Sequence, residues 1–229
     1  YDTVVREAIE NPDKNYLVIV PEQFTMQTQK DLCLAHPKGG IMNIDVLSFG
    51  RLAYRVFEEV GQDARVVLDD EGKNLVLRKI AGECEKDLKV FKGNLKKQGY
   101  ISEVKSVLSE FAQYGVDFER LDDFMKEVPP ESYLHYKLDD IRTIYEKFEE
   151  YLSEKYITKE EMLDVLSDAV PYSDILKGSV VAMDGFTGFT PVQNRLIGEL
   201  FSVCEKVMIT VTMDGRENPY VYEHPYQIF

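Results

Sequence analysis

The sequence lacks the features that would place it in a membrane or in a disulfide-linked secreted protein. No apolar run approaches the roughly 20 residues that a membrane-spanning helix needs. Residues 1–14 carry acids throughout, so no secretory signal opens the chain, and we expect a cytoplasmic protein without membrane contact. The cysteines Cys33, Cys84 and Cys204 are far apart and odd in number, which supports neither a disulfide framework nor a CxxC metal site.

Common catalytic and metal-binding motifs are also missing. The histidines His36, His135 and His224 are dispersed and have no neighbouring metal ligands, so no zinc site is predicted. There is no GxSxG nucleophile turn, no HExxH helix and no GxGxxG dinucleotide loop. We therefore predict neither a catalytic residue nor a metal site in this chain.

Basic residues are scarce relative to acidic ones. The chain has 27 Lys and Arg against 41 Asp and Glu, which gives a net charge of −14 at pH 7. A free-standing nucleic-acid-binding protein usually carries a basic surface. The composition therefore argues against tight DNA binding by this chain alone, whereas an acidic surface suits the docking of a basic protein partner.

What the sequence does contain is the pattern of a folded α/β core. Hydrophobic residues make up 44% of the chain, enough for a substantial interior. A helix is predicted after each of the strands expected at 16–20, 44–47 and 180–183. The first runs from Pro21 to Ala35, the second lies between the N-cap Ser48 and Gly61, and the third follows a capping box at Thr190. Alternation of strand and helix is typical of α/β proteins. Apolar runs rich in β-branched residues predict the buried strands of a parallel sheet at 16–20, 44–47, 180–183 and 207–211.

The middle of the chain breaks this alternation. No strand is predicted from about residue 68 to residue 156, and helices are expected at roughly 69–90, 101–113, 118–127 and 132–155. We therefore predict that residues 1–67 and 158–229 form one α/β domain and that residues 68–157 form a helical insertion. Because the sequence starts at Tyr1 without a methionine and already inside an expected helix at 2–10, we also expect it to be part of a longer protein.

Residues 180–193 carry the most informative motif. They read VVAMDGFTGFTPVQ, an apolar strand that ends in Asp184 and is followed nine positions later by Gln193. This frame is similar to the Walker B region of UvrD-type helicases, and DGFTGFTP resembles the AddB/RexB family of helicase–nuclease subunits. Further segments resemble the same family in the same order: VIVPEQFTMQTQ (18–29), DVLSFGRLAYRVFEEVG (45–61), LDDEGKNLVL (68–77) and YEKFEEYLSEKYITKEEMLDVLSDAV (145–170).

The resemblance covers nearly the whole chain and implies a fold. That fold is a RecA-like parallel sheet, the first half-motor of a superfamily-1 helicase, with residues 68–157 as an inserted α-helical subdomain. It also implies a remnant of a nucleotide and Mg²⁺ site at Asp184, Gly185 and Gln193. Motor helicases carry a second acid where Gly185 stands, and this acid polarises the attacking water, which glycine cannot do. The simpler explanations are an Asp-Gly turn for Asp184 and helix capping for Gln193.

Other residues of the matching segments are candidates for contact with DNA. Polar residues open the helix after the first strand, at the sheet edge where α/β proteins bind ligands. A hydroxyl and a cation near the second helix can reach a DNA backbone, and two phenylalanines of the glycine-rich turn can stack on a base. These candidates are Gln23, Thr25, Ser48, Arg51, Phe186 and Phe189.

Each candidate also has a simpler structural explanation. Polar residues of a first helical turn are usually solvated, and Ser48 is a natural N-cap. Arg51 and Arg55 can remain solvated or pair with Glu59, and the phenylalanines can anchor their turn in the core.

The resemblance implies a role in the processing of double-strand DNA breaks for recombinational repair. In that family the B subunit pairs with an A subunit that carries motor and nuclease activity, and the helicase-like part of the B subunit handles DNA and recognises a regulatory sequence. ATP with Mg²⁺ and a 4Fe-4S cluster are implied for full-length members only, so no cofactor is assigned to this chain. Two alternatives stay open: a protein-interaction scaffold that binds neither DNA nor nucleotide, and a competent helicase that tolerates Gly185.

Overall fold

The computed structural model describes residues 1–61, 65–94, 97–153 and 155–211. The chain divides into two compact units, which we call the α/β unit (Tyr1–Asp63 with Leu163–Phe229) and the helical unit (Ala64–Met162). His224 and the last part of the predicted α/β domain lie outside the described residues. The interpretation of the two units as a half-motor domain and its inserted subdomain stays a prediction.

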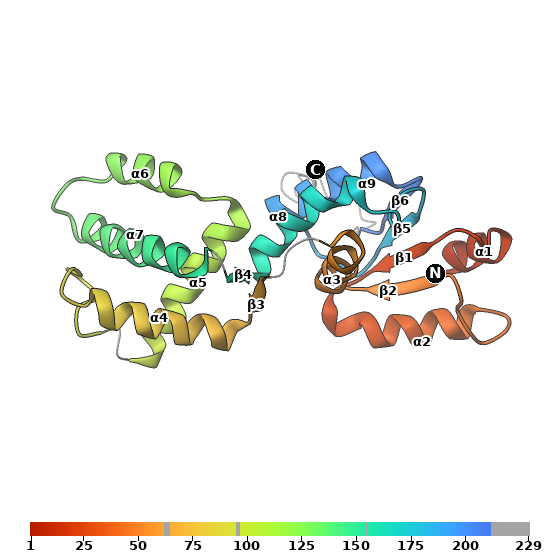
Figure 1. Cartoon of the computed structure of the whole chain (residues 1–229), viewed down its shortest axis with the longest axis horizontal. Helices are drawn as coiled ribbons and strands as arrows, with labels where there is room; N and C mark the ends of the chain where they lie inside the picture. The colour runs from red at the N-terminus through yellow and green to blue at the C-terminus, as the bar shows by residue number, and fades with distance from the viewer. Residues whose placement is uncertain (62–64, 95–96, 154, 212–229) are drawn as a thin grey trace, which may run out of the picture. The chain divides into compact units, whose positions relative to one another are not determined.

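The α/β unit is built on a four-stranded parallel sheet with the order β2-β1-β5-β6 (Figure 1). The strands are β1 (Tyr16–Ile19), β2 (Ile44–Leu47), β5 (Val180–Met183) and β6 (Lys206–Ile209). Tyr16 pairs with Ile44 on one side and with Val180 on the other. The prediction that strands from both ends of the chain share one parallel sheet is therefore confirmed.

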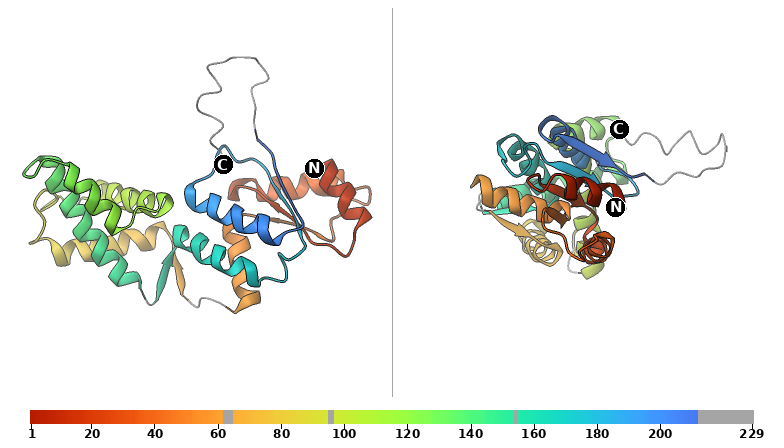
Figure 2. Two further views of the ribbon diagram at one scale, coloured as in Figure 1. Left: turned by 90° about the horizontal axis from the view of Figure 1, so that it is seen from above. Right: turned by 90° about the vertical axis from the view of Figure 1, so that its right-hand side faces the viewer.

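Helices flank the strands because both faces of the sheet are apolar (Figure 2). Successive side chains of a strand point to opposite faces. Tyr16, Val18 and Val20 share one core cluster with α1 and α2, whereas Leu17 and Ile19 point to the other face and are also fully buried. The flanking elements are α1 (Asp2–Glu10), η1 (Glu22–Phe24), α2 (Thr25–Ala35), α3 (Phe49–Val60), the part of α8 (Lys159–Ala169) that follows Met162, η2 (Val170–Tyr172) and α9 (Pro191–Val203).

Two helices of this unit begin as the sequence predicts. Ser48 caps α3 by accepting a hydrogen bond from the backbone N–H of Arg51, and Gly61 ends the helix in a left-handed conformation with φ of 69°. Thr190 and Gln193 form the predicted capping box of α9. The predicted helix at 21–35 differs at its start, because a 3-10 turn at Glu22–Phe24 precedes the α-helix.

The helical unit contains α4 (Asp70–Cys84), α5 (Gln98–Tyr114), α6 (Phe118–Glu127) and α7 (Tyr133–Leu152). The helix predicted at 69–90 ends early, at Cys84. The reason is a buried carboxylate: Asp140 of α7 accepts hydrogen bonds at 2.7–2.8 Å from the backbone N–H groups of Lys89, Val90 and Phe91. These bonds hold the segment after α4 as a loop. The helix predicted at 132–155 also ends earlier than expected, at Leu152.

Two short strands were missed at the limits of the predicted helical stretch. β3 (Val66–Leu68) and β4 (Tyr156–Thr158) pair in parallel, with Val66 opposite Tyr156. Strands of three residues are too short to show the alternation from which strands are predicted. This pair brings together the segments through which the chain enters and leaves the helical unit. Among the described helices, none has both the length and the apolar character needed to cross a lipid bilayer.

Candidate site at the carboxyl edge of the sheet

Loops from separate parts of the sequence meet at the carboxyl edge of the four-stranded sheet. Because the strands are parallel, the loops after β1, β2 and β5 all leave from this edge, which is where open α/β sheets usually bind ligands. These loops and the helices that follow them carry most of the predicted site residues. We define the carboxyl-edge surface by Glu22, Gln23, Phe24, Ser48, Arg51, Asp184, Gly185, Phe186 and Phe189.

Polar contacts join the loop after β1 to the start of α3. The Ser48 side chain is 5% exposed and donates a hydrogen bond from its hydroxyl to the carboxylate of Glu22. The guanidinium of Arg51 is exposed, with its Nε 3.8 Å from Oε1 of Glu22. Ser48 therefore both caps its helix and positions an acid, and Arg51 is left as the accessible cation of this surface.

One of the simpler explanations, the pairing of Arg55 with Glu59, needs correction at α3. Arg55 does not take the expected partner Glu59 but pairs with Asp45 at 2.6 Å. The carboxylate of Glu59 instead accepts hydrogen bonds from the hydroxyl of Ser173 at 2.5 Å and from the backbone N–H of Ile175 at 2.9 Å. The contact of Glu59 joins residues far apart in the sequence, so helical spacing alone does not reveal it.

A row of aromatic rings runs along the same surface. Phe186 lies with its ring centroid 5.3 Å from that of Phe49 and 5.1 Å from that of Phe189. Phe186 and Phe189 are partly buried, whereas Phe24 is 46% exposed. Phe24 lies across from Gly185, where an added Cβ would sit 3.5 Å from its ring. The two predicted phenylalanines thus anchor their turn, whereas Phe24 keeps nearly half of its surface exposed.

Asp184 extends from the end of β5 into a network of donors. The hydroxyl of Thr210, after β6, donates to its carboxylate. Burial alone would raise the pKa of Asp184, but hydrogen bonds from Thr210, from Tyr1 and from the backbone N–H of Gly185 outweigh burial and hold the pKa below its usual range. Asp184 is therefore a charged acceptor at neutral pH.

Gln193 and Thr25 use their side chains locally. The side-chain oxygen of Gln193 accepts a hydrogen bond at 2.9 Å from the backbone N–H of Thr190, within the capping box of α9. Thr25 is 8% exposed and donates its hydroxyl to the backbone carbonyl of Glu22 at 3.0 Å. Gln23 is exposed beside them. Of these three predicted residues, Gln23 presents its side chain to solvent.

The residues of the predicted nucleotide remnant do not fit a Mg²⁺ site. Mg²⁺ prefers octahedral coordination by oxygen, usually from carboxylates, phosphates and water. Of Asp184, Gly185 and Gln193, Asp184 alone offers a carboxylate, and the amide oxygen of Gln193 is engaged in helix capping. Within the ranges that the structure describes, there is no group of three or more His, Cys, Asp or Glu that could hold a metal ion. We therefore derive no reaction step through a metal or a nucleotide.

Sequence reasoning missed four residues of this arrangement: Glu22, Phe24, Phe49 and Thr210. Glu22 and Phe24 belong to the same VPEQFT segment as two predicted residues, so their position was an available signal. Phe49 lies in the matching segment at 45–61, is 7% exposed and supports Phe186 from the core. The contact of Thr210 with Asp184 depends on the pairing of β6 with β5, which no local pattern contains.

Comparison with known proteins gives one consistent result. Residues 1–229 match the family described as "ADDB, N-terminal". The B subunit of an ATP-dependent helicase/deoxyribonuclease from Lachnoclostridium phytofermentans is 46% identical over 217 residues, which cover 95% of this chain and 19% of that protein. Proteins of the same name from Alkaliphilus metalliredigens and Clostridium tetani are 36% and 34% identical, over 90% and 94% of this chain and 18% and 19% of their own lengths. The chain thus spans about a fifth of the length of the curated relatives it matches.

Proposed function

The chain belongs to the family of AddB N-terminal regions, and we propose that it is the helicase-like, motor-inactive part of the B subunit of a bacterial ATP-dependent helicase–nuclease. In this proposal the parent complex processes double-strand DNA breaks for recombinational repair. The α/β unit has the role of a RecA-like half-motor that no longer drives movement, and the helical unit is its inserted subdomain. The A subunit is the partner, and DNA is bound in the assembled complex.

The observation that carries this proposal is the convergence at the carboxyl edge. An exposed amide (Gln23) and an exposed ring (Phe24) come from η1 after β1, and an exposed guanidinium (Arg51) comes from the first turn of α3 after β2. The parallel pairing of β1 with β2 places these two segments at the same sheet edge. Arginine contacts phosphates, and aromatic rings stack on unpaired bases. This surface is suited to holding a DNA strand without doing chemistry on it.

Loss of motor activity is supported by Gly185. The position after Asp184, the first acid of the motif, carries no side chain, so the group that would orient an attacking water is missing. The donors around Asp184 hold its carboxylate in place as part of the structure.

The test is DNA binding by the complete two-subunit complex with Arg51→Ala in its B subunit. Removing one phosphate contact should weaken binding to single-stranded DNA several-fold and lower the slope of log K against log salt by about 1. Arg6→Ala is the matched control, because Arg6 is an exposed arginine of α1 outside the carboxyl-edge surface. Equal binding by the Arg51 variant, the control and the unmodified complex would refute a DNA role for this surface.

A scaffold function is the second candidate, and the net charge of −14 favours it. In this proposal the chain docks a basic surface of the A subunit and touches no DNA. A pull-down with the A subunit that weakens steeply with salt, together with unchanged DNA binding in the Arg51→Ala complex, would support the scaffold over the DNA-contact proposal.

A further inference from the structure

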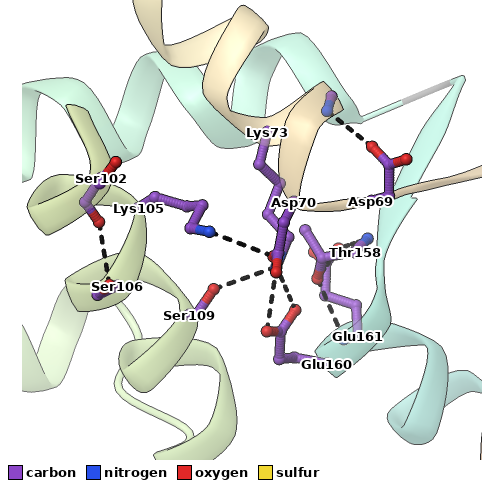
Figure 3. A network of polar contacts seen from close by, with 11 residues as sticks. Asp69, Asp70, Lys73, Ser102, Lys105, Ser106, Ser109, Thr158, Glu160 and Glu161 are labelled. Carbon is purple, nitrogen blue, oxygen red and sulfur yellow. Dashed lines mark hydrogen bonds and ion pairs between the residues drawn. The ribbon is translucent and has the colours of Figure 1, made fainter. Parts of the chain in front are cut away.

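A buried charged cluster lies inside the helical unit. Lys73 of α4 is 3% exposed, and its Nζ donates to Oε2 and Oε1 of Glu160 at 3.0 and 3.1 Å and to Oγ of Ser109 at 3.1 Å (Figure 3). Asp70 lies 3.7 Å from Lys73 and 3.5 Å from Lys105 of α5. These contacts use both lysines and tie α4, α5 and the first turn of α8 together.

The neighbouring acid Glu161 is held by a different set of bonds. Its Oε2 accepts hydrogen bonds from the backbone N–H of Thr158 at 2.7 Å and from the Thr158 hydroxyl at 2.9 Å, while its own N–H donates to that hydroxyl at 3.2 Å. This is a capping box at the start of α8. The Glu161 carboxylate is therefore fixed near the cluster by the fold of the backbone.

Glu149 of α7 lies beside this cluster but has no ion-pair partner in it. It shares a cavity of about 10 Å³ with Lys73, Lys105, Tyr145 and Glu160. A cavity of that size has room for about one water molecule and for no organic ligand. Across the described part of the chain, Glu149 forms no ion pair and no side-chain hydrogen bond, because the two lysines beside it are taken by Glu160 and Asp70.

A carboxyl group in this position is expected to hold a proton. Burial raises the pKa of Glu149 to about 7, and the nearby charge of Glu161 adds to the rise. Burial also raises the pKa of Tyr145, one turn earlier on α7, to about 12. Two separate groups that line one cavity thus both hold their protons to a higher pH than usual.

We propose that Glu149 is a proton-binding switch of the helical unit, and that loss of its proton loosens the packing of α7 against α4 and α5 as the pH rises through neutrality. Of the charged and titratable groups around it, Lys73 from α4, Lys105 from α5, Tyr145 from α7 and Glu160 from α8 line the same cavity. Glu161 from α8 acts on it through its charge, and Asp70 from α4 pairs with both lysines.

The direction of the effect follows from linkage. A glutamate in the unfolded chain loses its proton near pH 4.5, whereas Glu149 in the folded unit keeps it up to a pH of about 7. Proton binding therefore stabilises the folded unit fully below pH 4.5, and this stabilisation is lost as the pH rises through 7. Raising the pH from 6 to 8 lowers the equilibrium constant for closure of the unit about tenfold.

The first experiment is amide hydrogen exchange of the whole chain at pH 6 and pH 8, corrected for the intrinsic exchange rate. Protection of α7 should fall about tenfold in the wild-type chain between these pH values. Glu149→Gln, which cannot lose a proton, should show no such fall. Glu150→Gln, at the adjacent exposed position, should behave as the wild type. A fall of the same size in the Glu149→Gln chain would overturn the proposal.

A second experiment measures the protonation of Glu149 directly. The carboxyl carbon of Glu149 should titrate near pH 7 by NMR, and Glu161→Gln should shift that midpoint downward, because glutamine keeps the cap of α8 but removes the charge. A midpoint near 4.5 in the folded wild-type chain would also overturn the proposal, even if the variants fold poorly.

Discussion

Single buried polar residues fix the conformation of several loop segments in this chain. The hydrophobic pattern of the sequence does not predict these conformations. Asp140 is 1% exposed and replaces a helical turn by three hydrogen bonds to the loop after α4. In the α/β unit, Asn43 donates its amide to the carbonyls of Ala8, Asn11 and Lys14, each at 3.1 Å. Such contacts join distant positions, so the sequence predicts the helices around them but not where the helices stop.

Asp140→Ala should destabilise the helical unit by about 3 kcal/mol, because it leaves three backbone N–H groups without their acceptor in the interior. The measure is urea denaturation followed by a probe in the helical unit. Asp139→Ala is the matched control. Asp139 is the preceding residue, and its ion pair with Lys89 at 2.8 Å is partly exposed, so its loss should cost less than about 1 kcal/mol. Similar losses in the two variants would contradict this account of Asp140.

The backbone conformation at Gly185 favours glycine at this position. Its φ is +78°, in the left-handed region, while a Cβ would meet its nearest neighbours at an ordinary 3.5 Å. Conformation and not space therefore limits this position. Gly185→Asp and Gly185→Ala should each lower the free energy of unfolding by about 1 kcal/mol.

Under the proposed function, the same Gly185→Asp change in the complete B subunit places an acid where motor helicases carry one. We expect it to leave ATP hydrolysis at the level of the blank, because the carboxylate of Asp184, the first acid, is already engaged by hydrogen bonds from Thr210, Tyr1 and the backbone N–H of Gly185. A phosphate-release assay with DNA and Mg²⁺ measures this. Metal-dependent turnover in the aspartate variant but not in the alanine variant would contradict this expectation and would attribute the proposed loss of motor activity to a single missing acid.

At the scale of elements, the sequence predicts what is long, continuous and locally capped. The strands at 16–20 and 180–183 are uninterrupted apolar runs, and the strand at 44–47 is apolar apart from Asp45. The helices α3 and α9 carry their caps in the sequence. The strands β3 and β4 are not predicted from the sequence, because each has three residues and is stabilised by the other. The position of the candidate site at the carboxyl edge follows from strand order, but the contacts of Ser48 with Glu22 and of Phe186 with Phe49 come from packing.

The capping box of α9 allows two roles of Gln193 to be distinguished, namely helix capping and the predicted part in a nucleotide-site remnant. Gln193→Ala should lower the free energy of unfolding by about 1 kcal/mol, because the N–H of Thr190 loses its acceptor. Gln193→Glu should retain the stability, since glutamate serves equally well in a capping box. Thermal unfolding of both variants checks this. If the alanine variant is as stable as the wild type, helix capping does not explain this residue.

At the scale of the whole molecule, charge and composition limit what the chain does alone. With a net charge of −14, it should bind neither single- nor double-stranded DNA measurably at physiological salt. It should also show no ATP hydrolysis and no nuclease activity above the blank. Fluorescence anisotropy with labelled DNA and a phosphate-release assay check these outcomes, and tight binding by the isolated chain would contradict this interpretation of its charge.

The parallel pair β3 and β4 also has a consequence for the order in which the molecule assembles. Its two strands are three residues long, and nearly the whole helical unit lies between them in the sequence. So few ladder bonds cannot offset the entropy of closing so long a loop until the intervening helices have condensed. We therefore expect β3 and β4 to pair last during folding and to separate first under mechanical force.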